Sequence, residues 1–185
     1  MELAEISLAS RTVWPNERSS NGGIDQIPLP STRGELWLAG KHAVAPDAEA
    51  ALQGVKATTI VCLTEAHELA ERYPSYVEWL ATNIPLRAVW FPIHDLSAPS
   101  WETVSLLLHE LGRRLDRGER LLMHCAAGFG RAGTIAACLL IQLGLDIDDA
   151  LRLISACRPM AGPEVGAQRE LVRHAAEHAN RTTQG

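Results

Sequence analysis

Residues 120–143, RLLMHCAAGFGRAGTIAACLLIQL, consist of a short apolar run, a loop of small residues and a longer apolar run. The first run, Arg120–His124, follows the turn-like segment Asp116–Glu119 and predicts a buried strand. The second run, Arg131–Leu143, is apolar on nearly every side and stops at Gly144, which predicts a buried helix. The loop between them therefore joins the end of a strand to the start of a helix.

This loop places a cysteine and an arginine on either side of five small or apolar residues. Its backbone N–H groups can hold phosphate oxygens, and the planar guanidinium of Arg131 can bind two of them. Unpaired N–H groups and the helix dipole favour an anion here, either a phosphate or the thiolate of Cys125. The sequence thus predicts a nucleophile, Cys125, in the floor of a phosphate-binding loop. That loop comprises Ala126, Ala127, Gly128, Phe129, Gly130 and Arg131.

The same residues carry a resemblance to a known family. His124, Cys125, Gly128 and Arg131, with the trailing Gly133-Thr134, resemble the signature of the cysteine-dependent protein tyrosine phosphatase superfamily. The compact length resembles its dual-specificity branch, and the resemblance covers roughly residues 35–177. It implies that Cys125 forms a phosphocysteine intermediate and that Arg131 binds the phosphoryl group. It also implies supporting roles for His124, which we expect to brace the loop by hydrogen bonds, and for Thr134.

The family also uses an upstream aspartate to protonate the leaving oxygen. Asp95 is the candidate, because it lies where the predicted strand 86–91 enters a proline-bracketed loop. A general acid is needed because an alkoxide or phenolate leaves poorly without a proton. The alternative is that Asp95 only caps a turn or a helix start. His94 is a second candidate donor, although a surface histidine is the simpler interpretation.

One position departs from the family pattern. The family usually has Ser or Thr directly after the arginine, where the hydroxyl stabilises the departing thiolate during hydrolysis of the phosphocysteine, and this chain has Ala132. Thr134 lies further along the predicted helix, at a position that is usually structural in the family. We therefore expect a working enzyme whose second chemical step is slow.

The segment Arg158–Gln168 resembles the part of the family that flanks the site. Gln168 is a candidate for orienting the hydrolytic water, and the alternative is an ordinary polar residue in the first turns of the last helix. Arg158 could contact the rim of the pocket or a helix C-terminal carbonyl, and the second is our expectation.

Strands and helices alternate along the chain. This alternation predicts a single α/β domain with a central, mostly parallel sheet flanked by helices, and it places the catalytic loop between a strand and a buried helix. We predict a partly ordered N-terminal arm over residues 1–33, a phosphatase domain over 34–180 and a C-terminal tail over 181–185. The predicted strands are 35–40, 58–63, 86–91 and 120–124, and the predicted helices are 47–53, 75–81, 100–117, 131–143, 146–157 and 164–179.

The composition of the chain argues against nucleic-acid, membrane and metal partners. A hydrophobic content of 46% and a charged content of 21% fit a soluble globular protein, and a net charge of −5 argues against a nucleic-acid partner. No stretch predicts a membrane span or a signal peptide, so no membrane partner is expected. The four cysteines lack metal-site spacing and indicate a reducing compartment, the cytoplasm, with no metal or other cofactor. For Cys62, the alternative to core packing is a reversible disulfide with Cys125.

Three classes of function remain. The leading one is a phosphatase of phosphorylated proteins, acting on phosphotyrosine and extending to phosphoserine or phosphothreonine. The second is a phosphatase of a phosphoinositide, nucleotide or sugar phosphate, although the loop lacks the lysines that lipid-directed relatives often carry. The third is a phosphate-recognising interaction module with weak catalysis, which Ala132 favours and which retention of Cys125, Arg131 and Asp95 opposes. The oligomeric state is not predicted.

Overall fold

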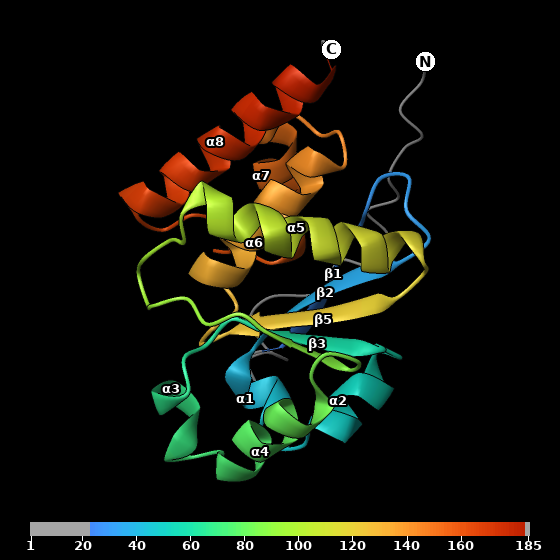
Figure 1. The fold of residues 1–185 in the computed structure, drawn as a ribbon, viewed down its shortest axis with the longest axis vertical. Coiled ribbons are helices and arrows are strands. Elements are labelled where there is room, and N and C mark those ends of the chain that lie inside the picture. The colour runs from blue at the N-terminus through green and yellow to red at the C-terminus, as the bar shows by residue number, and fades with distance from the viewer. Residues whose placement is uncertain (1–22, 184–185) are drawn as a thin grey trace.

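A five-stranded sheet lies between two layers of helices in the computed structural model, which describes residues 23–183 (Figure 1). The strand order is β1-β2-β5-β3-β4. Strands β2, β5, β3 and β4 are parallel, and β1 pairs antiparallel with β2 at one edge. The strands are β1 (Ile24–Ile27), β2 (Glu35–Gly40), β3 (Thr59–Cys62), β4 (Ala88–Trp90) and β5 (Arg120–Cys125). The predicted α/β fold with a mostly parallel sheet is confirmed.

Each face of the sheet is covered by its own set of helices and has its own apolar core (Figure 1). One face packs against α5 (Trp101–Asp116), α6 (Gly130–Gln142), α7 (Ile147–Cys157) and α8 (Gly166–Thr183). The other face packs against α1 (Lys41–Val44), α2 (Ala48–Gly54), α3 (His67–Ala70) and α4 (Pro74–Asn83). None of these helices, within the described part of the chain, is long and apolar enough to span a membrane.

Side-chain caps fix where several helices begin. Ser100 accepts a hydrogen bond from the Thr103 N–H at the start of α5, and Asp146 accepts one from the Asp149 N–H at the start of α7. Such caps satisfy N–H groups that have no partner inside the helix. Both helices begin one residue after the start of the predicted range, at Trp101 and at Ile147.

Three short elements were not predicted. Strand β1 lies inside the segment assigned to the N-terminal arm, of which residues 1–22 fall outside the described part. Helices α1 and α3 each span four residues, too short for a helical periodicity to show in the sequence. At the other end, α8 continues to Thr183, past the predicted end of the domain at residue 180.

The loop after β5 lies where three parallel strands end. The Lys41 N–H, directly after β2, donates to the Ala126 carbonyl at 2.9 Å, and the Leu63 N–H, directly after β3, donates to the His124 carbonyl at 2.9 Å. Helix α6 then leads away from the loop with twelve of its thirteen residues buried. Gly133 permits this close packing, because a Cβ atom there would lie 2.2 Å from the Gly162 backbone nitrogen. The carboxyl ends of the strands therefore meet at the loop that carries Cys125.

Candidate active site

Cys125 is the last residue of β5, and its side chain lies inside the loop that follows. The residue is buried, and the Gly128 N–H donates to its Sγ atom at 3.2 Å. Gly128 has φ +78°, and a Cβ atom at this position would lie 2.3 Å from the Ala39 carbonyl oxygen. Only glycine fits this curl without a shift of the neighbouring strand. The loop thus directs a backbone N–H at the predicted nucleophile.

Arg131, in the first turn of α6, is held by a carboxylate that the sequence analysis did not identify. Its Nη1 and Nη2 atoms donate to Oε1 and Oε2 of Glu68 at 2.6 and 2.8 Å, and Nη1 also donates to the Ile93 carbonyl at 2.8 Å. Burial disfavours ionisation of Glu68, but hydrogen bonds from Arg131 and from the Glu65 N–H outweigh it and lower the pKa of Glu68. The two-pronged ion pair fixes the orientation of the guanidinium beside the loop.

Asp95 reaches the same guanidinium from the loop after β4. Its Oδ1 atom lies 3.2 Å from Nη2 of Arg131, and its side chain is 63% exposed. The Ile93 N–H donates to the Leu63 carbonyl at 3.0 Å, which ties the start of this loop to the end of β3. His94, the other candidate donor, is 74% exposed and pairs with Glu65 at 2.9 Å. The structure therefore brings Asp95, rather than His94, to the residues of the phosphate-binding loop.

His124 lies on the opposite face of β5 from Cys125 and is fully buried. Its Nε2 atom lies 2.6 Å from the Tyr76 hydroxyl, and its Nδ1 atom lies 3.3 Å from the Cys125 carbonyl oxygen. Burial lowers the pKa of His124 to about 4, so the imidazole is neutral at ordinary pH. A neutral imidazole has one N–H group. Both contacts are satisfied when Nδ1 carries this hydrogen and donates it to the Cys125 carbonyl, while the Tyr76 hydroxyl donates to Nε2. His124 thereby links the loop to α4.

Arg158 supports the loop from behind, which corrects our expectation that it binds a helix C-terminal carbonyl. Its Nε and Nη2 atoms donate to the Gly128 and Ala127 carbonyls, each at 2.8 Å, and its Nη1 atom donates to Asp25 Oδ2 at 2.6 Å. The side chains of Arg158 and Asp25 are each 1% exposed. The guanidinium of Arg158 satisfies these two carbonyls of the loop. Asp25, on the strand that the sequence analysis missed, neutralises the buried charge.

We expect this brace to contribute strongly to stability. Asp25→Asn leaves Arg158 as a buried charge without its carboxylate, and we expect the free energy of unfolding to fall by about 3 kcal/mol in urea denaturation. Glu170→Gln is the matched control, because it removes the carboxylate of an exposed pair with Arg173 and should cost less than about 1 kcal/mol. Equal losses in the two variants would contradict the role of the brace.

Gln168 lies behind the loop that carries Asp95, where it is 1% exposed. Its amide oxygen accepts from the Glu164 N–H at 2.8 Å, and its amide nitrogen donates to the Ser97 carbonyl at 3.2 Å. These two hydrogen bonds tie the loop of the predicted acid to the segment before α8. A role for Gln168 in orienting water stays a prediction, while its contact with the acid loop is a feature of the structure.

Ala132 and Thr134 lie in the buried part of α6. Among residues 23–183, the Oγ1 atom of Thr134 has no hydrogen-bond partner. The hydroxyl that the family supplies directly after the arginine is thus absent at Ala132, and the nearest hydroxyl along the helix makes no bond in its place.

Cys62 lies on the other face of the sheet from Cys125. The register of β3 and β5 pairs Cys62 with His124, and its side chain packs in the core beneath α1–α4, whereas Cys125 belongs to the core beneath α5–α8. Burial raises the pKa of the Cys62 thiol to about 11, which makes it a poor partner for thiol exchange. This arrangement favours core packing for Cys62 over a disulfide with Cys125. Within residues 23–183 no group of three His, Cys, Asp or Glu side chains is arranged to hold a metal ion.

A protein family with the same kind of site matches most of this chain. The profile of the family described as PTP-SAK, "Swiss Army Knife protein, DSP-PTPase phosphatase domain", matches residues 37–184. The chain belongs to this family, which makes it a cysteine-based phosphatase domain of the dual-specificity class. The predicted resemblance is confirmed.

Solved structures agree with the fold. Tk-PTP in its active form has 25% sequence identity and a TM-score of 0.62, over 82% of this chain and 96% of that chain. Kinase associated phosphatase (KAP), with a serine in place of its catalytic cysteine, has 18% identity and a TM-score of 0.71, over 85% and 96%. PTPMT1 has 13% identity and a TM-score of 0.68, over 88% and 100%. The last two comparisons, below 25% identity, show the fold alone.

Proposed function

We propose that this protein hydrolyses phosphomonoesters, with phosphotyrosine in proteins as the main substrate and phosphoserine or phosphothreonine as further ones. The observation that carries the proposal is the convergence of Cys125, Arg131 and Asp95 at one loop, with a 3.2 Å contact between Gly128 N–H and Sγ and a 3.2 Å contact between Arg131 and Asp95. A nucleophile, an anion ligand and a proton donor are the three parts that phosphoryl transfer through a cysteine requires.

The first step transfers the phosphoryl group to sulfur. The Cys125 thiolate attacks phosphorus and forms an S–P bond while the ester P–O bond breaks, and protonated Asp95 gives its proton to the leaving oxygen. The loop N–H groups and the guanidinium of Arg131 hold the equatorial oxygens, where negative charge accumulates in the transition state. Glu68 keeps the guanidinium in place, so little reorganisation is needed when the phosphate arrives.

The second step releases phosphate. Water attacks the phosphocysteine, the S–P bond breaks, the thiolate of Cys125 leaves and the carboxylate of Asp95 accepts the proton of the water. A hydroxyl next to the departing sulfur would stabilise the thiolate, and Ala132 has none. The geometry therefore supports a well-equipped first step and a slow second step.

The variant Ala132→Ser tests this asymmetry. We expect wild-type enzyme to release a pre-steady-state burst of leaving group, and Ala132→Ser to raise the slow steady-state rate by about tenfold and to shrink the burst, because the new hydroxyl can donate to the thiolate. Stopped-flow absorbance with an aryl phosphate measures both phases. Thr134→Val is the control and should leave both phases unchanged. Linear product release from time zero in the wild type, unchanged in Ala132→Ser, would contradict the prediction.

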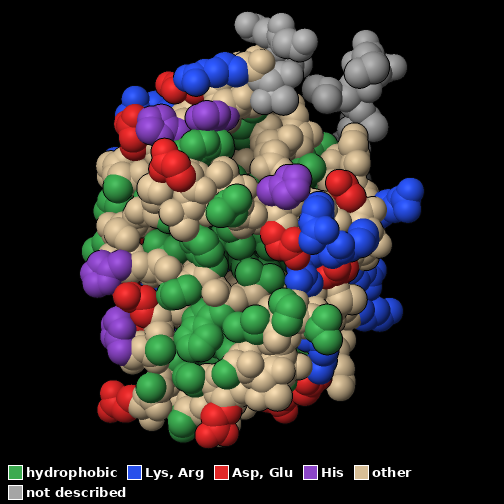
Figure 2. Space-filling view, in the orientation of Figure 1, with side chains coloured by type: hydrophobic (Ala, Val, Ile, Leu, Met, Phe, Trp, Pro, Cys, Tyr) green, Lys and Arg blue, Asp and Glu red, His purple; other side chains and the backbone are tan. Residues whose placement is uncertain are grey.

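The surface charges support a protein rather than a nucleic-acid substrate. On the face shown in Figure 2, Lys and Arg side chains near the C-terminal end of α5 lie among Asp and Glu side chains. Arg113 and Arg114 pair with Glu110, and Arg117 pairs with Glu119. Interleaved charges of both signs do not form the basic patch that binds a phosphate backbone. A free nucleophilic thiol also suits a reducing compartment such as the cytoplasm.

A lipid phosphate is the second candidate. PTPMT1 has been crystallised in complex with PI(5)P and shares 12% identity with this chain in that structure, which makes a phosphoinositide worth testing. Against it, residues 126–130 of the loop contain no lysine to bind a second phosphate.

A substrate panel tests the proposed function. It compares phosphotyrosine and phosphoserine peptides of one sequence with phosphoinositides and nucleotides, and Cys125→Ser serves as the background control. We expect the highest kcat/KM on the phosphotyrosine peptide. A higher kcat/KM on a phosphoinositide or a nucleotide would contradict the proposal that the substrate is a protein, but not the proposal that the enzyme hydrolyses phosphate esters. If no member of the panel is hydrolysed, both proposals are wrong.

A further inference from the structure

Glu164, in the segment before α8, places a carboxylate against the phosphate-binding loop. Its side chain packs on Gly130, the loop residue directly before Arg131, so closely that a Cβ atom at this glycine would collide with Oε2 of Glu164. The Glu164 N–H donates to Gln168 Oε1 at 2.8 Å, and its carbonyl accepts from Nη2 of Arg169 at 3.2 Å. These two hydrogen bonds fix the backbone from which the carboxylate reaches the loop.

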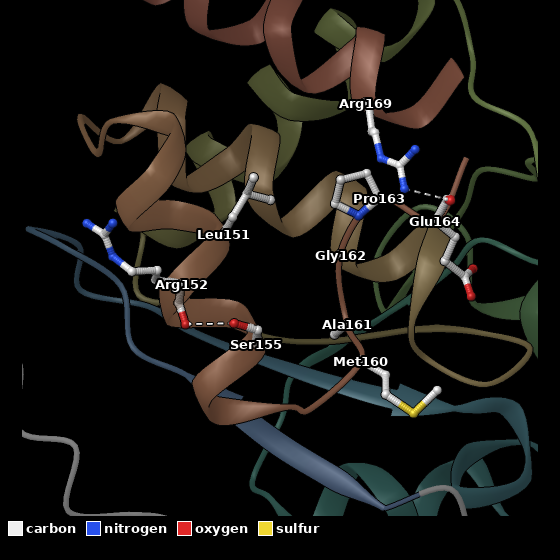
Figure 3. Close-up of a pocket in the computed structure, with 9 residues that line it drawn as sticks. All are labelled: Leu151, Arg152, Ser155, Met160, Ala161, Gly162, Pro163, Glu164 and Arg169. Atoms are coloured by element: carbon white, nitrogen blue, oxygen red, sulfur yellow. Dashed lines mark hydrogen bonds between the residues drawn. The ribbon is translucent and has the colours of Figure 1, made fainter. Parts of the chain in front are cut away.

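The carboxylate of Glu164 has no ion-pair partner among residues 23–183. Arg169 binds the backbone carbonyl of Glu164, and in Figure 3 the carboxylate points away from that guanidinium. Three other carboxylates at the site, in contrast, pair with arginines: Glu68 and Asp95 with Arg131, and Asp25 with Arg158. Glu164 thus adds an unpaired negative charge beside a loop that has to bind an anion.

A carboxylate in this place opposes the binding of a phosphate group. The phosphate of an ester carries up to two negative charges, and like charges repel at short range. An exposed carboxylate elsewhere on a protein surface needs no explanation. Glu164, however, lowers the affinity for every phosphate ester that brings no compensating charge. A substrate with a positive group next to its phosphate would gain an ion pair instead, and the same carboxylate then discriminates between substrates.

We propose that Glu164 selects phosphoproteins that carry an arginine or a lysine beside the phosphorylated residue. The inference rests on the proposed function, because the cationic side chain reaches Glu164 only while the phosphate occupies the loop. Arginine suits this role best, since its planar guanidinium can donate to both oxygens of a carboxylate. A substrate with glutamate in the same place would bring a further negative charge to Glu164.

A positional scan of phosphotyrosine peptides tests the proposal. At each position within two residues of the phosphotyrosine, arginine is compared with citrulline, its neutral analogue, and with glutamate. For the wild type we expect kcat/KM to be about fivefold higher with arginine than with citrulline at one or more positions, and lowest with glutamate. The value of kcat should be the same for all peptides, because each peptide leaves before the slow hydrolysis of the common phosphoenzyme.

Substitutions of Glu164 show whether this carboxylate causes the preference. In Glu164→Gln the difference between the arginine and citrulline peptides should disappear, and in Glu164→Lys the glutamate peptide should become the best substrate. The kcat/KM of the citrulline peptide should not fall in Glu164→Gln, which shows that the variant is folded. Glu170→Gln is the matched control, because it removes an exposed carboxylate of α8 that pairs with Arg173, and it should keep the wild-type preference.

Other results would overturn the inference. Equal kcat/KM for arginine and citrulline peptides at every position in the wild type, or a preference that persists in Glu164→Gln, would show that Glu164 does not bind the substrate. A lower kcat on every peptide in Glu164→Gln, with kcat/KM unchanged, would assign Glu164 to the hydrolysis of the phosphocysteine instead. In these cases the proposed function stands, because phosphotyrosine peptides are still hydrolysed. If the wild type hydrolyses no peptide, the proposed function fails and the inference fails with it.

Discussion

Replacing the nucleophile should abolish turnover while leaving the binding site intact. In Cys125→Ser we expect kcat to fall by at least about four orders of magnitude, because a serine hydroxyl without a neighbouring base attacks phosphorus poorly. The Gly128 N–H and the Arg131–Glu68 pair remain in place, so the variant should still bind a phosphotyrosine peptide. Steady-state assays measure the loss of activity, and calorimetry measures the retained binding.

A control separates the loss of this particular thiol from the loss of any cysteine. Cys138→Ala removes a buried thiol from α6 whose Sγ atom faces the Leu171 carbonyl of α8, and we expect it to retain wild-type turnover. Activity that survived in Cys125→Ser would end the proposed mechanism. A Cys125→Ser variant that also lost peptide binding would contradict the assignment of the loop as the phosphate site.

Removing the proposed acid should slow the enzyme according to the leaving group. In Asp95→Asn we expect kcat on a phosphotyrosine peptide to fall by roughly 10²- to 10³-fold, because the tyrosine oxygen departs without a proton. An activated ester such as p-nitrophenyl phosphate should lose far less, because its leaving group is already stable as an anion.

His94→Asn is the matched control for Asp95→Asn. It removes the neighbouring candidate donor, whose ring pairs with Glu65 and has no contact with Arg131, and we expect little change in kcat. If His94→Asn reduced kcat on poor leaving groups more than Asp95→Asn, His94 rather than Asp95 would be the general acid. Equal losses on good and poor leaving groups in Asp95→Asn would show that Asp95 only positions Arg131.

The elements of the fold that were predicted correctly have strong local patterns. The strand before Cys125 and the helix after it are continuous apolar runs, and Ser100 and Asp146 mark helix starts with their own side chains. Strand β1 lacked such a signal, because its four residues bury Asp25 on the same face as Ile27. That aspartate is buried only because Arg158, 133 positions away in the chain, lies opposite it.

In the candidate site, too, the residues with a local sequence pattern were predicted, and those that depend on distant contacts were not. Cys125, Arg131 and Asp95 could be located because a sequence motif and a strand end place them. Glu68 was missed although it follows the end of β3, next to the loop. Its position was the available signal, since carboxylates just after neighbouring parallel strands gather at one sheet edge. Tyr76 carried no signal, because its partner His124 is defined only when α4 packs beneath the sheet.

Capture of the phosphoenzyme is the decisive test of the proposed two-step mechanism. A ³²P-labelled aryl phosphate is mixed with the enzyme and quenched with acid on the millisecond scale, and the labelled peptide is then identified by mass spectrometry. We expect a phosphocysteine at Cys125 that accumulates during turnover, because Ala132 leaves its hydrolysis slow. Turnover without labelled enzyme, or a label on another residue, would contradict it.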